Sequence, residues 1–210
     1  MSDLLCLPWR PLRLCVRKSF AQRRKGRQGK HLSEQQISTP DSREQKIMKS
    51  EARKNLIRIL QNAHAGEMAA AYAYRGHWKS LKNSAEKERI KLIEAEEWMH
   101  RENAARWLEK FGAKPNRRRE KIFWTIGRSL GVACYVSGWF FPMYFAGRLE
   151  SQNVQEYVDA AEYAKELEML DCFDEMMEMS RIEGEHEIFF RGTVAGHRLL
   201  PLTKRFFRWS

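Results

Sequence analysis

The sequence of 210 residues contains little proline and glycine and no long alternating pattern of strands. Six prolines and twelve glycines leave room for long uninterrupted helices, because these two residues weaken a helix interior most. Half-buried β-strands would show apolar and polar residues in alternation, and no long run of that kind occurs. The sequence therefore predicts an all-α protein.

Cysteine is scarce as well, and its spacing excludes two common classes of site. The four cysteines are Cys6, Cys15, Cys134 and Cys172. No two of them have the spacing of a zinc site or of a thioredoxin-like redox pair. Cys134 lies in an apolar run, and we expect it in the core. The simplest interpretation is a reducing compartment with free thiols.

Acidic residues are too few to balance the basic ones, and the excess of positive charge lies at the ends of the chain. The net charge is +11, with 38 Lys and Arg against 27 Asp and Glu. Residues 1–33 alone contain nine Lys or Arg and a single acid. A basic chain can bind nucleic acid or an anionic membrane surface. Because the middle of this chain is nearly balanced, we expect a membrane surface or a basic arm, and no nucleic acid.

The composition divides the chain into three parts. With 43% hydrophobic residues the chain can form one domain with a real core, which we expect in residues 46–195. Residues 1–45 are either a basic flexible arm or a mitochondrial targeting segment, because transit peptides are basic and poor in acids. The aromatic residues of the basic tail, residues 196–210, are Phe206, Phe207 and Trp209. This mixture favours docking of the tail on a membrane surface.

One long run of the sequence has no charge. Residues 129–147 are 19 uncharged residues, and as a straight helix they would span about 28 Å, close to the thickness of a bilayer core. Pro142 would kink such a helix, so we expect an interfacial or half-buried hairpin anchored by Trp139 and Tyr144. A buried core helix is the alternative. The basic residues 117–119 beside the run would suit anionic lipid headgroups.

The sequence contains a Glu-x-x-His pair twice. Glu97 and His100 form the first pair, and Glu183 and His186 form the second. Residues three apart lie on the same face of a helix, with Cβ atoms about 5–6 Å apart, so both members of a pair can reach one metal ion. Either pair alone is a weak indication, because a surface face of salt bridges is the alternative. Both pairs lie on apolar stripes, however, whereas a neighbouring acid such as Glu96 falls off the stripe.

Four long helices are expected from the spacing of the apolar residues. They span residues 43–80, 84–112, 148–169 and 171–192. Glu67 lies in the middle of the apolar stripe of the first helix. In the third helix Glu150 lies on the stripe, whereas Glu156 lies among polar neighbours and is the fallback. A lone carboxylate on an apolar face costs several kcal/mol unless it is paired or binds a metal.

Two Glu-x-x-His pairs and two single Glu residues are the ligand set of di-iron or di-manganese proteins built on a four-helix bundle. The set is Glu67, Glu97, His100, Glu150, Glu183 and His186. Carboxylate and imidazole ligands suit iron or manganese, and we expect two iron ions, with manganese less favoured. The sequence thus predicts a ferritin-like four-helix bundle with an extra hydrophobic, membrane-associating helical segment and a catalytic metal centre. Tyr74 and Tyr157, near these ligands, either tune hydrogen bonding there or are packing residues with satisfied hydroxyls.

Four stretches of the sequence together resemble one known family of enzymes. They are His64-Ala65-Gly66-Glu67, the Glu97/His100 pair, Leu130-Gly131-Val132-Ala133 and Glu183-Gly184-Glu185-His186. Over roughly residues 55–195 the chain resembles the demethoxyubiquinone hydroxylases, which are ferritin-like di-iron monooxygenases of ubiquinone biosynthesis. The resemblance implies that the six ligands bind iron and that the enzyme hydroxylates a quinone precursor. His64 belongs to the family's motif without an assigned role.

The resemblance also implies partners and a location. The substrate would be a lipid-tailed quinone precursor, with O2, an unidentified electron donor and a membrane surface as further partners. A lipid-binding partner protein or a homo-oligomer is left open. The enzyme would be a peripheral membrane protein, of the mitochondrial inner membrane if residues 1–45 are a transit peptide and otherwise of the cytoplasmic face of a bacterial inner membrane.

Departures from the family and other functions leave alternatives open. Leu149 stands where a second acid is expected, so a divergent member could act on another lipid or quinone. A ferritin-like or rubrerythrin-like iron-binding protein without hydroxylase activity is the second hypothesis. A non-enzymatic helical protein of the membrane surface is the third.

Overall fold

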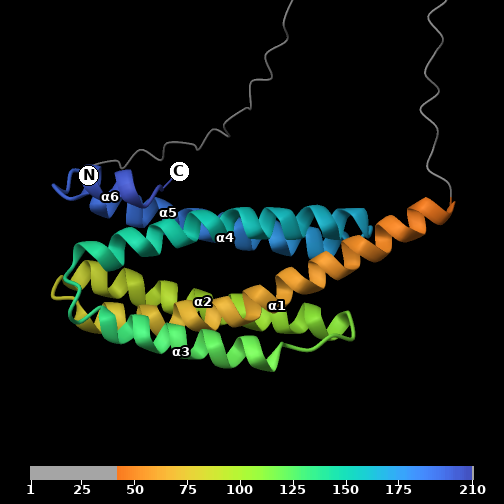
Figure 1. Cartoon of the computed structure of the whole chain (residues 1–210), viewed down its shortest axis with the longest axis horizontal. Coiled ribbons are helices and arrows are strands. Elements are labelled where there is room, and N and C mark those ends of the chain that lie inside the picture. The colour runs from red at the N-terminus through yellow and green to blue at the C-terminus, as the bar shows by residue number, and fades with distance from the viewer. Residues whose placement is uncertain (1–41, 210) are drawn as a thin grey trace, which may run out of the picture. The chain divides into compact units, whose positions relative to one another are not determined.

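The computed structural model describes residues 42–209. Six helices and no strand occupy this part of the chain (Figure 1). They are α1 (Ser42–Ser80), α2 (Ser84–Lys110), α3 (Arg117–Ala133), α4 (Phe140–Glu166), α5 (Leu170–Val194) and α6 (Leu200–Phe206). The predicted all-α class is confirmed. Residues 1–41, which make up most of the expected arm or targeting segment, lie outside the described residues, and residues 42–45 already belong to α1.

Two of the helix starts follow from the local sequence. The Asn83 side chain accepts hydrogen bonds from the backbone N–H groups of Ala85 (3.0 Å) and Glu86 (3.1 Å) at the start of α2. Asn116 caps the start of α3 in the same way. Such caps satisfy backbone N–H groups for which the first turn of a helix offers no acceptor. They set the positions at which the chain enters these two helices.

The four long helices form a bundle of two pairs. α1 packs along α2 and α4 packs along α5, and α1 also contacts α4. α3 lies outside this set of four, against α1, and leads from one pair to the other (Figure 1). The predicted four-helix bundle is confirmed, and α3 lies outside it as an additional helix.

The core of the bundle consists of two apolar regions with a polar layer between them. The first region includes Leu56, Leu60, Trp107, Ala161 and Met176. The second region includes Tyr74, Ile90, Ile93, Tyr144 and Phe190. Each long helix contributes to both regions, so the middle of each helix lies between them. Polar side chains in this middle layer are therefore shielded from water at both ends.

The uncharged run of residues 129–147 is two helix ends joined by a turn. It contains the end of α3, a turn over residues 134–139 and the start of α4. This arrangement is closer to the expected hairpin than to a single core helix. α4 begins at Phe140 rather than near residue 148 as predicted, and Pro142 falls in its first turn, where a missing N–H is tolerated. Among the helices of residues 42–209, none is both long and apolar enough to cross a membrane.

Two aromatic residues expected at a membrane surface are buried instead. Tyr144 is fully buried and donates a hydrogen bond to the carbonyl oxygen of Phe207. Trp209 is 6% exposed and packs edge-on against Tyr144, with 5.2 Å between the ring centroids. Gly147 has no side chain, and the Trp209 ring fills that space. The predictions that Tyr144 anchors an interface and that Trp209 docks outside the core were wrong, whereas Phe206 and Phe207 are exposed.

α3 lies directly on α1 because glycine occupies the crossing of the two helices. A Cβ added at Gly76 of α1 would collide with the backbone of Gly131 of α3. A Cβ at Gly131 would lie 2.8 Å from the Tyr72 carbonyl oxygen, and one at Gly127 would collide with the backbone of Ala69. The two backbones can therefore approach only because these side chains are absent.

Candidate metal centre

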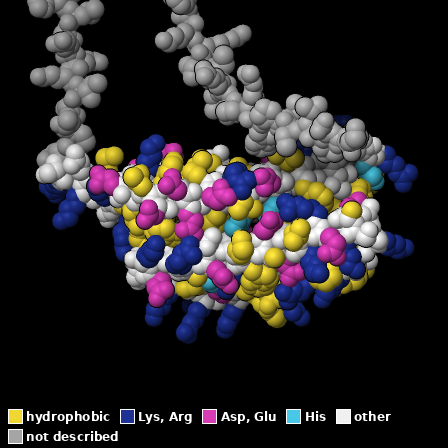
Figure 2. Space-filling model, turned by 180° about the vertical axis from the view of Figure 1, so that it is seen from behind, with side chains coloured by type: hydrophobic (Ala, Val, Ile, Leu, Met, Phe, Trp, Pro, Cys, Tyr) yellow, Lys and Arg dark blue, Asp and Glu magenta, His cyan; other side chains and the backbone are white. Residues whose placement is uncertain are grey.

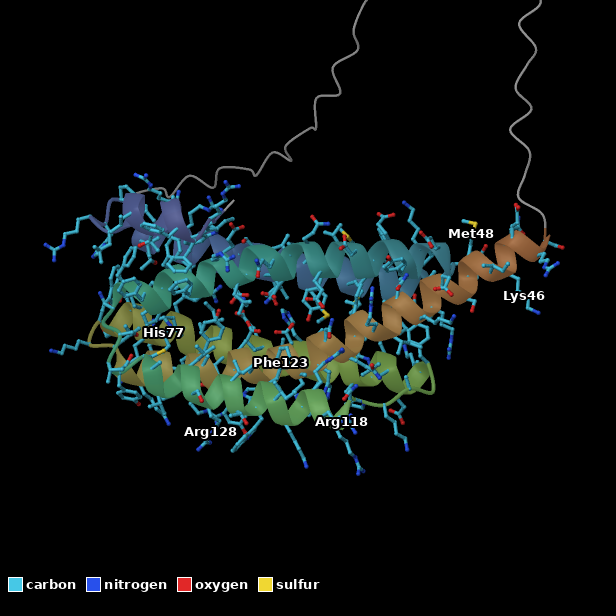
Figure 3. All side chains as sticks on the ribbon, in the orientation of Figure 1. Lys46, Met48, His77, Arg118, Phe123 and Arg128 are labelled. Carbon is cyan, nitrogen blue, oxygen red and sulfur yellow. The ribbon has the colours of Figure 1, made fainter. Side chains whose placement is uncertain are left out.

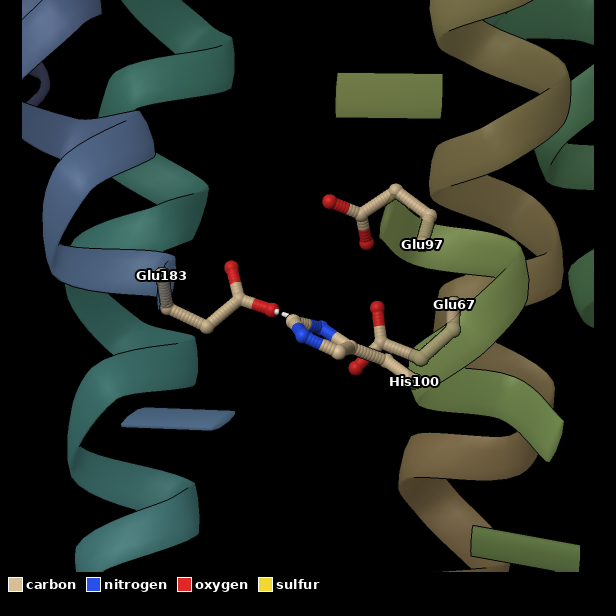
Figure 4. A group of neighbouring side chains, drawn as sticks. All are labelled: Glu67, Glu97, His100 and Glu183. Atoms are coloured by element: carbon tan, nitrogen blue, oxygen red, sulfur yellow. Dashed lines mark hydrogen bonds and ion pairs between the residues drawn. The ribbon is translucent and has the colours of Figure 1, made fainter. Parts of the chain in front are cut away.

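The six residues expected to bind metal converge in the polar layer of the bundle. They are Glu67 on α1, Glu97 and His100 on α2, Glu150 on α4, and Glu183 and His186 on α5. The most exposed of them, Glu67, shows only 3% of its surface. Figure 4 shows Glu67, Glu97, His100 and Glu183 pointing toward one another from three helices. We call the six residues the carboxylate–histidine cluster.

The cluster contains two overlapping groups of possible ligands. The first group is Glu67, Glu97, His100 and Glu183, and the second is Glu97, Glu150, Glu183 and His186. Within each group, one ligand atom per residue lies within 4.8 Å of the others. Each group has three carboxylates and one imidazole. Glu97 and Glu183 belong to both, so the cluster offers two overlapping sets of residues that could each hold a metal ion.

Several buried ligand atoms of the cluster have no hydrogen-bond partner among residues 42–209. They are Glu67 Oε2, both carboxylate oxygens of Glu97, His100 Nε2, Glu183 Oε2 and His186 Nδ1. A buried polar atom left unsatisfied costs about 1–3 kcal/mol, and folded proteins contain few of them. Divalent ions would satisfy these atoms together, and carboxylate and imidazole are donors that iron and manganese accept. The residues therefore fit a pair of such ions.

Burial and mutual repulsion shift the pKa values of the carboxyl groups. Burial raises the pKa of Glu97 well above its usual value, and the charge of Glu183 raises it further. Burial and the charge of Glu183 act on the pKa of Glu150 in the same way. Burial also acts to raise the pKa of Glu183, but its hydrogen bond with His100 Nδ1, at 2.8 Å, helps to hold it well below the usual range. Four carboxylates cannot all ionise in so dry a space unless cations balance them.

A comparison with protein families gives a match over most of the chain. The family model described as ubiquinone biosynthesis protein COQ7 matches residues 54–189, a range that contains the whole cluster. The chain belongs to the COQ7 family. The resemblance to the demethoxyubiquinone hydroxylases is thereby confirmed, and the family acts as a hydroxylase of ubiquinone biosynthesis. No curated protein and no solved structure matches the chain.

In this COQ7-family chain a carboxylate outside the cluster holds His186. Nε2 of His186 lies 2.7 Å from Glu96 Oε2, and its Nδ1 lies 3.3 Å from Glu97 Oε1 inside the cluster. An imidazole whose second nitrogen is held by a carboxylate is usual around a metal. Glu96 was not among the ligand residues expected from the sequence, because it falls off the apolar stripe of α2. Nothing in the sequence distinguishes it from the surface acids around it.

Two tyrosines hold the carboxylates that belong to only one group of ligands. The Tyr74 hydroxyl donates a hydrogen bond to Glu150 Oε1, and Asn153 Nδ2 donates to Glu150 Oε2 at 2.9 Å. The Tyr157 hydroxyl donates to Glu67 Oε1. Both rings are buried in the core. Both expectations for these tyrosines therefore hold, because their rings pack in the core and their hydroxyls orient the carboxylates.

Glu156, the fallback in the third long helix, does not join the cluster. Neither group of ligands includes it, whereas Glu150 belongs to one of them. Burial raises the pKa of Glu156 to about 7, and the charge of Glu67 contributes to this shift. The structure brings Glu150, and not Glu156, together with the other five residues.

His64, which had no assigned role, connects three helices of the COQ7-family fold. Its Nδ1 lies 2.7 Å from Glu120 Oε1 on α3. Arg101 of α2 donates to the other oxygen of Glu120 at 2.6 Å and also to the carbonyl oxygen of His64. Because His64 stands one turn before Glu67 on α1, these contacts hold α3 and α2 beside the cluster.

A largely apolar cavity runs beside the cluster, between α1, α3 and α4. It has two adjoining parts, of about 400 Å³ and about 360 Å³. The wall residues common to both parts are Ala70, Ala73, Leu130 and Leu149. The larger part reaches Glu67 and Tyr157, and the smaller part reaches Tyr74. A molecule in the cavity would therefore lie against residues that hold both groups of ligands.

Proposed function

We propose that this protein is a di-iron monooxygenase that hydroxylates a lipid-tailed, demethoxyubiquinone-like quinone precursor with O2. The observation that carries the proposal is the buried pair of ligand groups that share Glu97 and Glu183. Membership in the COQ7 family supports a hydroxylase of ubiquinone biosynthesis. The shared carboxylates support two metal ions rather than one. An electron donor of unidentified chemistry completes the reaction.

Iron is the metal that the proposal assigns to the cluster. Two bound iron ions would supply the redox chemistry that activates O2 for reaction with the substrate ring. Among the protein's own groups, Glu97 and Glu183 would bridge the two positions, and the other four ligands would complete them. The tyrosine hydroxyls keep the two terminal carboxylates in place, and Glu96 keeps His186 in one orientation.

The cavity supports a substrate with a hydrocarbon tail. Phe141 and Phe145 line its smaller part, and Phe123 of α3, labelled in Figure 3, lines its larger part. A quinone ring in this cavity would lie beside the cluster, and apolar walls would surround the tail. Such walls also exclude water, which strengthens electrostatic interactions at the site.

The outer surface of α3 supports attachment to a membrane. Its exposed apolar residues that do not line the cavity, with those of the turn after it, include Ile122, Trp124, Val132, Tyr135 and Val136. Arg118 points away from the bundle on this helix (Figure 3), and Arg128 is exposed beside the Trp124 ring. Figure 2 shows hydrophobic side chains gathered beside Lys and Arg on one face of the molecule. Apolar side chains flanked by basic ones suit a surface of anionic lipid.

We therefore propose a peripheral location on a membrane. If residues 1–45 act as a transit peptide, the membrane is the mitochondrial inner membrane. Otherwise it is the cytoplasmic face of a bacterial inner membrane. The same attachment would bring the cavity close to a substrate that is dissolved in lipid.

The metal content of the purified full-length protein tests the metal centre. We expect about two irons per chain in the wild type. Glu97→Ala and Glu183→Ala should each lose most of the metal, because each removes a ligand from both groups. The matched controls are Glu102→Ala on α2 and Glu185→Ala on α5, which remove exposed carboxylates and should retain the iron.

Hydroxylation is then measured with a short-tailed demethoxyubiquinone, a chemical reductant and isotopically labelled O2. The wild type should transfer one labelled oxygen atom to the ring, and the two cluster variants should not. A folded wild type without stoichiometric metal would overturn the proposal. Stoichiometric iron without hydroxylated product would instead favour the ferritin-like or rubrerythrin-like iron-binding alternative.

A further inference from the structure

His77 is a buried histidine that the carboxylate–histidine cluster does not use. It lies on α1 and is 2% exposed. Its Nε2 has no hydrogen-bond partner among the residues that the structure describes. The residue lines the smaller part of the apolar cavity, and Figure 3 shows it on the side of α1 that faces the bundle. An unsatisfied buried nitrogen is unfavourable in a folded protein, so this one needs a partner that residues 42–209 do not supply.

Few other polar side chains of the cavity wall can serve a ligand. Apart from His77, the smaller part of the cavity is lined by the polar groups of Tyr74, Cys134 and Ser137. The Tyr74 hydroxyl is already bonded to Glu150, and Ser137 is exposed to solvent. The Cys134 thiol is a weak hydrogen-bonding group. His77 is therefore the buried side chain of this wall that can still form a hydrogen bond with a ligand.

The position of His77 relates it to the cluster. His77 stands three residues after Tyr74, so the two side chains share one face of α1. The Phe190 ring of α5 stacks on both, with ring centroids 5.8 Å from Tyr74 and 6.4 Å from His77. These ring contacts hold the His77 imidazole in a fixed orientation. A ligand bonded to His77 would lie about one helical turn from the tyrosine that holds Glu150.

The imidazole is neutral near pH 7, because burial lowers the pKa of His77 to about 4. A neutral imidazole carries one N–H donor and one acceptor nitrogen. It can donate to a carbonyl oxygen of a quinone, or accept from a hydroxyl of the corresponding hydroquinone. It therefore suits a ring whose oxygens change between these two states.

We propose that His77 is the polar anchor of the cavity, and that its imidazole hydrogen-bonds a ring oxygen of the bound quinone beside Tyr74. The inference rests on the proposed function, because it takes a quinone as the occupant of the cavity. It adds a substrate-binding residue outside the cluster. The apolar wall then binds the tail, and His77 sets the position of the ring.

Binding to the iron-loaded full-length protein tests this role with two probes. One is a short-tailed ubiquinone with a geranyl chain, and the other is geranylbenzene, which has the same chain and no oxygen. His77→Leu should weaken ubiquinone binding about 3- to 10-fold, the loss expected for one hydrogen bond. Geranylbenzene should bind His77→Leu as it binds the wild type. His77→Gln, which keeps a donor and an acceptor, should recover part of the affinity.

The control variant is Thr125→Ala on α3, which removes an exposed hydroxyl outside both parts of the cavity and should leave both affinities unchanged. The melting temperature of His77→Leu should not fall, because the variant removes an unsatisfied nitrogen. If His77→Leu lost the same affinity for both probes, or melted at a lower temperature than the wild type, His77 would only pack the core. Either result would overturn the proposal that His77 anchors the ring. Unchanged ubiquinone binding in His77→Leu would do the same. A wild type that binds neither probe would contradict the proposed function itself.

Discussion

Glu97 and Glu183 belong to both groups of ligands, whereas Glu67 and Glu150 belong to one each. The carboxylates also differ in what holds them. Glu67 and Glu150 accept hydrogen bonds from tyrosine hydroxyls, and neither oxygen of Glu97 has a hydrogen bond within residues 42–209. Both oxygens of Glu97 are therefore available to metal ions. The Tyr157 hydroxyl holds one oxygen of Glu67 and leaves the other without a partner among the described residues, whereas both oxygens of Glu150 accept hydrogen bonds, from Tyr74 and Asn153.

Removal of the hydroxyl that holds Glu67 should weaken iron binding. We expect Tyr157→Phe to lower iron affinity by about 10-fold, because partners that orient a metal ligand typically contribute 10- to 100-fold. The measurement is competition with a chelator of known affinity. Tyr163→Phe on the same helix lies outside both groups of ligands and should bind iron as the wild type does. Equal affinities in the two variants would show that Tyr157 is a packing residue.

At the level of secondary-structure elements, the four-helix bundle does not require α3, but the cavity does. It meets α1 at the glycine crossing, and the His64–Glu120–Arg101 contacts hold its first turns. Its inner side forms one wall of the cavity through Phe123, Ile126 and Leu130. A shift of α3 would therefore change the cavity before it changed the cluster.

A side chain at the glycine crossing should separate the two helices. We expect Gly76→Ala to destabilise the protein by about 1–3 kcal/mol, because the added methyl group meets the backbone of Gly131. Urea unfolding measures this loss. In Gly192→Ala on α5 the added methyl group meets no atom within 4 Å, so that variant should be neutral or stabilised by about 0.4–1 kcal/mol. Similar stabilities for the two variants would contradict a close crossing.

For the molecule as a whole, the cluster joins all four long helices, so its charge acts on the stability of the entire bundle. An ion that binds only the folded state stabilises it by about 2.7 kcal/mol at one hundred times its Kd. Without ions, the folded state contains carboxyl groups that resist ionisation. Metal binding and pH should therefore affect unfolding together.

We expect the metal-free protein to lose stability as the pH rises above about 6.5. Burial raises the pKa of Glu67, Glu97 and Glu150 in the folded state. In the folded state these carboxyl groups keep protons that they have already lost in the unfolded chain, and this stabilises the folded state. The stabilisation disappears as the pH rises through the folded pKa values. Glu156, with a pKa of about 7, acts in the same direction. Thermal unfolding with a chelator at several pH values measures the decline.

Two histidines set the lower limit of this pH range. Burial lowers the pKa of His64 and His77, so their contribution to stability increases with pH, but only up to their ordinary pKa of 6.5. Above that value only the groups with raised pKa values act. Iron-loaded protein should show a smaller decline, because bound cations favour the ionised carboxylates. A melting temperature of the metal-free protein that is constant or rises over the range would contradict the prediction.

Helical periodicity was sufficient to predict the main helices and the acidic residues on their apolar faces. Glu67 and Glu150 stand out because the geometry of a helix depends only on residues three or four positions apart. The same local spacing carries the two Glu-x-x-His pairs and the resemblance to the COQ7 family. These features required no knowledge of how distant parts of the chain meet.

Contacts between distant residues account for what periodicity missed. Glu96 is 90 residues from His186, and Tyr144 is 63 residues from Phe207, so neither pairing leaves a local pattern. Trp209 is buried only because Gly147 leaves a space for its ring. The cavity needs the crossing of α1 and α3. These pairings, the burial of Trp209 and the cavity all depend on how the helices pack, because a side chain's burial and hydrogen bonds depend on the residues that surround it in the folded protein.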